Sequence, residues 1–438
     1  MQRPVHAAVK FLRLLGWFFG CLDCGTIRRV ITRTIFGVGL ALLLAPASTS
    51  LRAVSPQEIG TADAVRADEP QVIRDQIRLC QIPAPPFHES ARGQAMKTAF
   101  EQAGLADVRI DRAGNVLGVR HGVADGPQLV VAAHLDTVFP EGTDVRVTRS
   151  GARLKGPGIG DDCRGLAVML SIVRALLRDR VQLRRSITFV ADVGEEGLGD
   201  LRGVRELFGA TLKGQVDQFI SIDGAGLFIT TGGVGSHRYR VTFTGPGGHS
   251  YAAFGTPNPI QAMGRAISKI SQIQVPGQPK TTFSVGRVGG GTSINAIPSE
   301  CWMEVDLRSA GASELAALTA KFDEAVDAGV REENARWTSA QRITVRKERV
   351  GERPAGRTPD DSPIVQTARR VAKTLGVTLP ENESSTDANI PMSLKIPAVT
   401  IGAGGSGAGQ HTTGETFDTA DSWKGSQYAL QLVIALAR

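Results

Sequence analysis

Acidic and imidazole side chains recur where short apolar runs of this sequence end. The runs cover 129–133, 187–193, 219–222 and 398–401, and they lead into His134 and Asp136, into Glu195 and Glu196, into Asp223, and into the loop that reaches His411. Sites in open α/β sheets form beyond the carboxyl ends of the strands, so these side chains are expected to converge. Imidazole and carboxylate groups gathered in one place are what a zinc site requires.

Asp161 is the natural candidate for a carboxylate that bridges two metal ions. It lies in Gly158-Ile159-Gly160-Asp161-Asp162, a loop relieved by glycines just before a predicted helix. Two ions can be held by a few nitrogen and oxygen ligands if one carboxylate bridges them. The sequence therefore nominates five metal ligands, namely His134, Asp161, Glu196, Asp223 and His411.

The elements that must position these residues follow an alternating pattern. Near-continuous apolar strand patterns alternate with amphipathic helical ones such as 166–177, after a helical stretch at 71–103 that is interrupted at 83–86. Such runs are typical of strands covered on both faces. The sequence predicts an α/β catalytic domain, with a mixed sheet and helices on both faces, formed by residues 71–235 and 353–438.

Between these two parts of the catalytic domain, the order of predicted strands and helices is that of one βαββαβ unit. Its elements are predicted at 239–244, 259–273, 282–288, 301–307, 314–330 and 342–350. Because the strand at 398–401 resumes the earlier pattern, residues 236–352 are interpreted as an inserted α+β lid of ferredoxin-like type.

The basic charge of the chain is concentrated at its beginning. Of the formal net charge of +7, residues 1–47 carry +5. The rest of the chain therefore lacks the excess of positive charge that nucleic-acid binding requires. Arginines ahead of the apolar run 35–45, followed by Ala45-Pro46-Ala47, predict a signal peptide at 1–47 and a linker at 48–70. The expected location is periplasmic or secreted, and the alternative is an uncleaved segment that provides the only membrane contact.

The motifs in order resemble the co-catalytic dizinc metallopeptidases, a family that includes tripeptidase (peptidase T), glutamate carboxypeptidase, aminoacylase and succinyl-diaminopimelate desuccinylase. The likeness covers about residues 70–438. It rests on His-x-Asp-Thr-Val at His134, Gly-x-Gly-x-x-Asp-Asp at Gly156, Glu-Glu-Gly at Glu195, Asp-Gly at Asp223, Gly-Gly-His-Ser at Gly247 and the late His411.

This resemblance implies roles for the nominated residues. It places His134, Asp161 and Asp223 on one zinc ion, and Asp161, Glu196 and His411 on the other. Asp136 is expected to accept the far imidazole N–H of His134, and Glu195 to serve as general base. The resemblance also implies a cis peptide between Asp161 and Asp162. Oxygen and imidazole ligands also accept cobalt or manganese.

The lid residues singled out by the resemblance are His249, Asn295 and Arg308. His249 is the histidine expected to reach a partner's site across a homodimer, whereas Asn295 and Arg308 are expected to hold the substrate. The simpler alternatives are a turn at His249, a turn cap at Asn295 and a strand-edge charge at Arg308. The glycine-rich loop 402–409 is expected to offer free N–H groups to a carboxylate.

Several other residues have simpler interpretations. Asp162, Asp192 and Asp200 are interpreted as surface charges or loop supports, and Cys80, Cys163 and Cys301 as buried free thiols. Cys163-Arg164 stands where related proteins often carry Lys, so the positive charge is shifted by one residue. Histidines at 6, 88, 121 and 237 have no motif context and are taken as packed or exposed.

The predicted function is zinc-dependent hydrolysis of a peptide or N-acyl amide bond in a small substrate, in the manner of an exopeptidase. The segment 385–389 resembles the tripeptidase and glutamate carboxypeptidase branches of the family more than the others. Two alternatives stay open: an N-acyl amino acid amidohydrolase, and a non-catalytic protein that binds a peptide or metabolite on the same fold. Retention of Glu195 argues against the second, because binding alone needs no general base.

Overall fold

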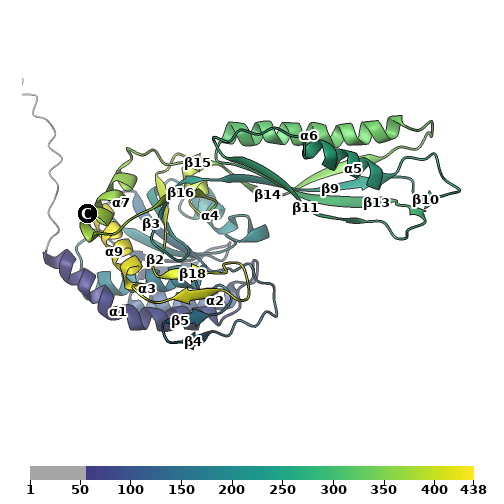
Figure 1. The fold of residues 1–438 in the computed structure, drawn as a ribbon. Coiled ribbons are helices and arrows are strands. Elements are labelled where there is room, and N and C mark those ends of the chain that lie inside the picture. Colours follow the sequence, from purple (N-terminus) through teal and green to yellow (C-terminus); the bar gives the residue numbers. More distant parts are fainter. Residues whose placement is uncertain (1–55) are drawn as a thin grey trace, which may run out of the picture. The chain divides into compact units, whose positions relative to one another are not determined.

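The computed structural model describes residues 56–438, and its largest element is a nine-stranded sheet (Figure 1). The main path runs β1 (Ala106–Ile110), β2 (Val116–Arg120), β6 (Ile187–Asp192), β3 (Gln128–His134), β7 (Val216–Ile222), β17 (Ala398–Ile401), β8 (Ile229–Gly233) and β15 (Gly356–Arg357), and β16 (Glu381–Ser384) pairs with β8. Strand β3 is parallel to β6 and β7, and β7 is parallel to β17, whereas β1–β2, β2–β6, β8–β17 and β8–β15 are antiparallel. The predicted mixed sheet is therefore confirmed.

Alternating side chains of β3 supply two separate cores. Leu129, Val131 and Ala133 pack on one face, and Val130 and Ala132 pack on the other. The first face is covered by α1 (Pro56–Cys80), α2 (Ser90–Ala103), α3 (Cys163–Arg178), α7 (Pro363–Leu375) and α9 (Trp423–Ala437). The second is covered by α4 (Arg202–Glu206), the π-helix Leu207–Thr211 and α8 (Asn389–Ser393). Helices on both faces explain the nearly continuous apolar strand runs.

Helix α1 corrects the prediction of a linker at 48–70. The helix begins at Pro56, and within it Val65 and Glu69 are buried. The Glu69 carboxylate lies 2.9 Å from the guanidinium of Arg164, and Asp68 pairs with Arg174, both on α3. The small and polar composition of residues 56–70 thus concealed the first part of a helix, in which Val65 is buried and Asp68 and Glu69 pair with arginines of α3. The predicted signal peptide and residues 48–55 lie outside the described residues.

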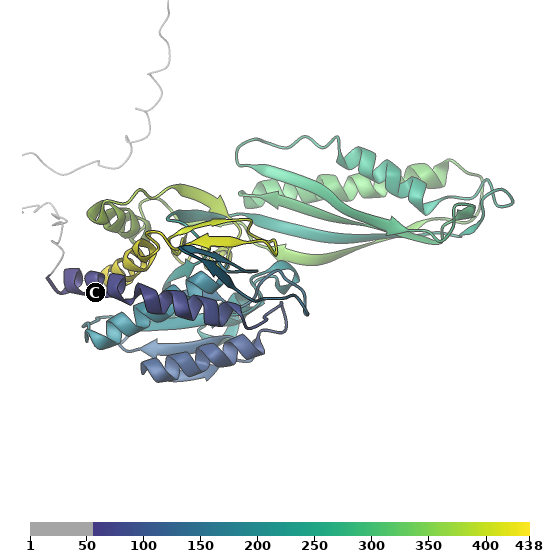
Figure 2. The ribbon, with the colours of Figure 1, turned by 60° about the horizontal axis from the view of Figure 1, so that its bottom comes forward.

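The inserted unit has the predicted order β9 (Gly235–Thr244), α5 (Pro259–Ile270), β11 (Thr281–Gly290), β13 (Glu300–Ser309), α6 (Ala312–Ala335) and β14 (Thr344–Arg353). Its strands form an antiparallel sheet in the order β11-β13-β9-β14, which is the ferredoxin-like arrangement. Tyr239, Val241 and Phe243, at alternate positions of β9, are buried with α5 and α6. Both helices therefore lie on one face of this sheet (Figures 1 and 2).

Two small sheets were not predicted. Strands β4 (Thr148–Ser150), β5 (Arg153–Lys155), β18 (Ser406–Ala408) and β19 (Thr416–Asp418) form one, and β10 (Gly248–His249) pairs with β12 (Ala296–Ile297) in the other. The first sheet corrects the expectation for the glycine-rich loop. Strand β18 pairs with β19, and the N–H groups of Gly402, Ala403 and Gly404 donate to main-chain oxygens. These three groups are not free for a ligand.

Cys80, Cys163 and Cys301 are free and buried, as predicted. Among the helices that the structure describes, none is long and apolar enough to cross a membrane.

Candidate metal centre

The five nominated ligands converge beyond the carboxyl ends of the central strands. His134 ends β3, Asp223 follows β7, Glu196 lies in the loop after β6, Asp161 precedes α3, and His411 lies between β18 and β19. Two triplets form here, with all potential ligand atoms of each within 4.8 Å of one another: His134 with Asp161 and Asp223, and Asp161 with Glu196 and His411. Asp161 belongs to both triplets, which is the position that a bridging carboxylate requires.

His134 is held in one orientation by its own loop. Its Nδ1 lies 3.0 Å from the main-chain oxygen of Asp136, whereas the nearest carboxylate oxygen of Asp136 is 3.7 Å away. Because a carbonyl oxygen only accepts, Nδ1 donates to it, and this contact turns Nε2 toward the cluster. Nε2 lies 2.9 Å from Asp161 Oδ1. The carboxylate expected at Nδ1 is thus farther from the ring than the carbonyl of the same residue.

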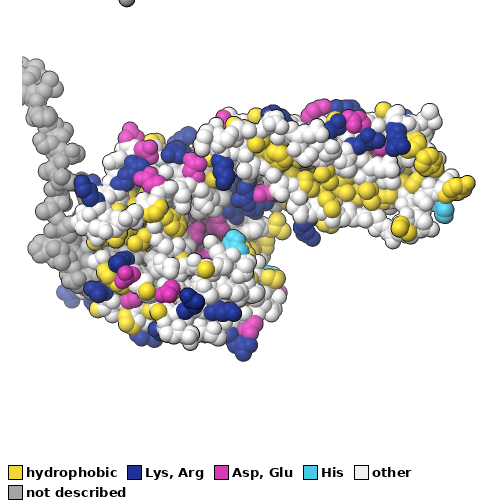
Figure 3. Space-filling view, in the orientation of Figure 1, with side chains coloured by type: hydrophobic (Ala, Val, Ile, Leu, Met, Phe, Trp, Pro, Cys, Tyr) yellow, Lys and Arg dark blue, Asp and Glu magenta, His cyan; other side chains and the backbone are white. Residues whose placement is uncertain are grey.

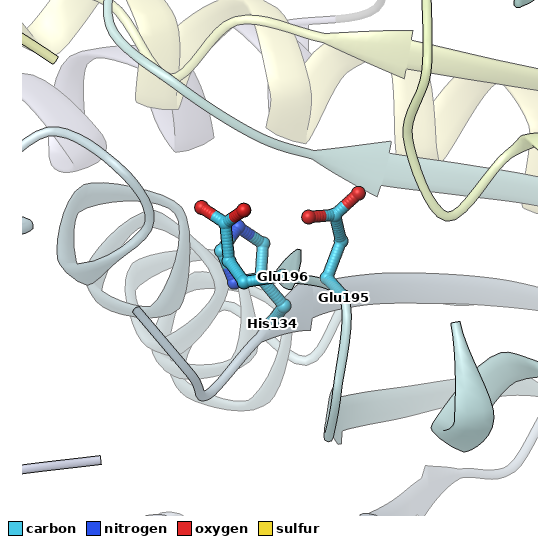
Figure 4. A group of neighbouring side chains, drawn as sticks. All are labelled: His134, Glu195 and Glu196. Carbon is cyan, nitrogen blue, oxygen red and sulfur yellow. The ribbon is translucent and has the colours of Figure 1, made fainter. Parts of the chain in front are cut away.

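The Asp136 carboxylate instead supports the paired glutamates. Its Oδ1 accepts the N–H of Glu195 at 3.0 Å, and its Oδ2 accepts the N–H of Glu196 at 2.8 Å. Asp136 is fully buried, so these charge-assisted hydrogen bonds are shielded from water. Figure 4 draws Glu195 and Glu196 beside His134. One carboxylate therefore links the His134 loop to both acids.

The loop that carries Asp161 is organised by Glu415, which sequence reasoning missed. The Glu415 carboxylate accepts the N–H groups of Gly158, Gly160 and Asp161 at 3.0, 2.8 and 3.2 Å. A Cβ on Gly160 would lie 3.0 Å from Glu415 Oε1, and Gly158 has a φ of +74°. The glycines thus allow the loop to wrap closely around this carboxylate. The Asp161–Asp162 peptide is cis, as the resemblance implied.

Glu195 has a partner that no motif indicated. Its carboxylate Oε1 lies 2.9 Å from Nη1 of Arg353, the last residue of β14. Burial raises the pKa of Glu195 to about 8, although the Arg353 charge opposes the rise. Arg353 comes from the strand that returns the chain from the lid, more than 150 positions away from Glu195 in sequence. Local pattern carries no signal for such a pair.

The donor set fits divalent metal ions. The two triplets offer imidazole nitrogen and carboxylate oxygen, which suit zinc and similar ions. Burial, together with the nearby Asp161 carboxylate, raises the pKa of Asp223 to about 7. Hydrogen bonds to Asp161 and Glu196 raise the pKa of His411 to about 10. Crowded buried carboxylates of this kind are stabilised when a cation lies among them.

Three neighbouring residues are buried, so Asp162 and Asp192 are not surface charges, and the contacts of Asp162 fit the alternative prediction of a loop support. Asp162 is fully buried, where it caps α3 by accepting the Gly165 N–H at 3.0 Å and also accepts the His134 N–H at 3.2 Å. Asp192 is fully buried as well, and burial raises its pKa to about 6. Arg164 is buried and donates to the main-chain oxygens of Ala403 and Ser422, so its charge faces α1 rather than the cluster.

The lid residues divide into two groups. Arg308 lines a cavity of about 520 Å³ that also contains Asp161, Glu195, Glu196, Asp223 and His411. His249 and Asn295 are exposed and do not line this cavity; they lie at β10 and β12, at the end of the lid away from β15 (Figure 1). Figure 3 shows acidic and histidine side chains in a hollow beside the lid. The structure therefore brings Arg308 to the cluster of the same chain, but not His249 or Asn295.

The described histidines without motif context have ordinary surroundings. His121 is exposed near Asp107, and His237 Nδ1 lies 2.8 Å from the Thr319 hydroxyl. Neither belongs to a candidate metal group in the described part of the chain.

Comparison with known families agrees with this geometry. The model of the peptidase family M20/M25/M40 matches residues 130–435. Over 253 residues, the chain is 27% identical to a succinyl-diaminopimelate desuccinylase of Leptothrix cholodnii, covering 54% of this chain and 65% of that protein. An N-acetylcysteine deacetylase of Bacillus subtilis is 25% identical over 48% of this chain and 57% of its own length. The match thus spans less than two thirds of each of these relatives.

Solved structures share the fold over nearly their whole length. A tripeptidase of Staphylococcus aureus superposes with a TM-score of 0.71 at 23% identity, covering 84% of this chain and 99% of that one. The dipeptidase Dug1p of Saccharomyces cerevisiae has a TM-score of 0.68 at 14% identity, covering 87% and 98%. At these identities the comparison establishes the architecture of a catalytic domain with a lid.

Proposed function

The chain belongs to the peptidase family M20/M25/M40, and from this premise we propose that it hydrolyses a peptide or N-acyl amide bond of a small substrate as an exopeptidase that uses two zinc ions. The observation that carries the proposal is the pair of triplets that share Asp161, with Glu195 beside them in the same cavity. A cavity of about 520 Å³ suits a small substrate.

The residues of the chain divide the chemistry among them. His134, Asp161 and Asp223 would hold one ion, and Asp161, Glu196 and His411 the other. When bound, such ions polarise a carbonyl group and lower the pKa of water. Glu195 takes a proton from the attacking water on its carboxylate and gives it to the nitrogen of the leaving amine. Arg308 lines the same cavity and offers a guanidinium to a carboxylate of the substrate.

Deacylation of an N-acyl amino acid is the second candidate function. It is favoured by the relatives named desuccinylase and deacetylase, whereas the solved structures named tripeptidase and dipeptidase favour peptide cleavage. Both reactions break an amide bond and require the same general base. The difference between them lies in the group that occupies the cavity on the carbonyl side of that bond.

The test is hydrolysis of a panel of dipeptides, tripeptides and N-acyl amino acids by the protein loaded with zinc, with Glu195→Gln beside it. Loss of the general base is expected to lower kcat by about 10² to 10⁴-fold while the zinc content stays the same. Cobalt and manganese are compared in the same assay. If the wild-type protein bound a member of the panel and hydrolysed none, the non-catalytic alternative would replace the proposal.

Two further proposals concern assembly and location. We propose a homodimer formed through the lid, in which the exposed His249 and Asn295 serve the cavity of the partner. We also propose export to the periplasm or the exterior, which rests on the residues before Ala47. Sedimentation of an active monomer would contradict the first, and an unprocessed N-terminus retained in the cytoplasm would contradict the second.

A further inference from the structure

Arg353 is a buried arginine at the junction between the lid and the catalytic domain. It is the last residue of β14, and in the lid sheet it is paired in register with Ser236, near the start of β9. Its side chain is 4% exposed, and it lines the cavity of about 520 Å³ that contains the metal cluster. Because the guanidinium has lost nearly all contact with water, it depends on protein groups for its hydrogen bonds.

Two of these hydrogen bonds are made with one residue, Glu195. Nη1 of Arg353 lies 2.9 Å from Oε1 of the Glu195 carboxylate, and Nη2 donates to the main-chain oxygen of Glu195. Nη1 also donates to the Ser385 hydroxyl at 3.2 Å. A planar guanidinium that contacts both the carboxylate and the backbone of one residue restricts the direction in which that carboxylate points.

Glu195 is therefore held from two sides. Its N–H group donates to the Asp136 carboxylate at 3.0 Å within the catalytic domain, whereas its main-chain oxygen and its carboxylate accept from Arg353 of the lid strand. The neighbouring Glu196 also donates its N–H to Asp136, but its carboxylate lies 3.2 Å from His411. Arg353 thus contacts the proposed general base, while the adjacent carboxylate faces the metal cluster.

The segment that follows the paired glutamates is attached to the same two lid strands. Nη1 of Arg238, on β9, donates to the main-chain oxygen of Gly197 at 2.7 Å. The N–H of Glu352, on β14, donates to Asp200 Oδ1 at 2.9 Å, and Arg205 of α4 donates to the main-chain oxygen of Glu352. These contacts fix the end of β14 against the loop that carries the proposed general base.

We infer that Arg353 is a positioning residue for Glu195. The inference rests on the proposed function, since it takes Glu195 to be the general base. A base must point at the proton that it takes, and a misplacement of about 1 Å can cost about 100-fold in rate. Arg353 itself takes no part in proton transfer, because a guanidinium stays protonated in proteins. Its contribution is the direction of the Glu195 carboxylate.

Arg353→Ala is the first test. It is expected to lower kcat by about 100-fold, with KM within about threefold and zinc content unchanged, because the metal ligands keep their own contacts. Arg349→Ala is the matched control, since Arg349 lies on the same strand and contacts Tyr239 and Glu352 instead of Glu195. The control should retain the wild-type kcat. A wild-type kcat for Arg353→Ala would overturn the inference.

Chemical rescue separates the guanidinium contacts from simple filling of space. Arg353 lines the metal cavity, so a small cation can enter the space that Arg353→Ala leaves. Guanidinium ion, at concentrations too low to unfold the protein, is expected to restore part of the lost activity, whereas neutral urea is not. Arg353→Lys should retain intermediate activity, because an ammonium can make only some of these contacts. Equal restoration by urea would overturn the inference, because filling the space would then be enough.

A double variant tests whether Arg353 acts through Glu195. If the arginine only positions this carboxylate, adding Arg353→Ala to Glu195→Gln should change the residual kcat by less than about threefold. A second loss of about 100-fold would overturn the inference, because Arg353 would then support the reaction without the Glu195 carboxylate. The single and double variants are compared on one substrate at equal zinc content.

A crystal structure of Arg353→Ala keeps this inference separate from the proposed function, because it does not depend on turnover. A displaced Glu195 carboxylate, with the five nominated ligands in place, supports the positioning role even if every substrate of the panel proves inert. An unmoved Glu195 side chain overturns it even if the wild-type protein hydrolyses a member of the panel.

Discussion

The metal cluster and the tip of the lid both carry residues that the motifs singled out, but their surroundings are opposite. His134, Asp136 and Asp161 are nearly inaccessible, and each contacts others of the group. At the tip, His249 and Asn295 are exposed, and Ile294 is completely so. The first region is organised within one chain before any ligand arrives. In the second region the side chains are exposed to solvent in the described chain, and the proposed dimer would supply a partner for them.

We expect the largest effect on metal binding and activity for Asp161→Asn. An amide in place of the shared carboxylate removes negative charge from both triplets, so both ions are expected to bind weakly. Activity should fall by more than the roughly 10- to 100-fold typical of residues that only orient a ligand. Metal content by mass spectrometry and kcat/KM measure the change. The exposed Asp125→Asn is the isosteric control and should behave as the wild type.

Asp136→Asn is expected to have the next largest effect. An amide has one acceptor oxygen, so one of the buried N–H groups of Glu195 and Glu196 loses its partner. We expect a loss of about 10- to 100-fold in zinc affinity or activity, measured by competition with a chelator and by steady-state kinetics. Wild-type values for both would mean that the Asp136 carboxylate does not organise the cluster.

The proposed dimer predicts a result that a site formed within one chain would not give. His249→Ala and Glu195→Gln are each expected to be nearly inactive, but their mixture should recover activity if each His249 serves the partner. Random exchange gives half heterodimers with one complete site each, so recovery should approach about a quarter of the wild-type activity. The variants are mixed under mild dissociating conditions and assayed after re-equilibration. No recovery in a mixture shown to exchange subunits would place the function of His249 within its own chain.

The smallest effect on stability is expected for Ile294→Ser. Because this side chain is fully exposed, the free energy of unfolding should change by less than about 0.5 kcal/mol. If the tip forms the dimer contact, the same change should weaken dimerisation, because it removes apolar surface from the interface. Urea unfolding and sedimentation measure the two effects separately. Unaltered dimerisation would place the interface elsewhere on the lid.

The sequence by itself determined the central strands that end at the cluster, the βαββαβ lid and the residues of the cluster. Apolar runs that end in His134, Glu195 and Asp223 are local signals, and the strand geometry then brings their ends to one edge. The linker prediction at 48–70 failed because helix α1 is held by burial of Val65 and by ion pairs to α3, which local composition does not encode.

Only the tertiary structure decided which side chains support the cluster. The Glu415 carboxylate accepts hydrogen bonds from the Asp161 loop, although the two are more than 250 positions apart in the sequence. Arg353, at the end of the last lid strand, contacts Glu195. A lone Glu or Arg is usually a solvated charge, so neither residue is distinguishable in sequence. Their roles follow from burial, because a buried charge needs a close partner. Which residue becomes that partner depends on how segments distant in the sequence pack together.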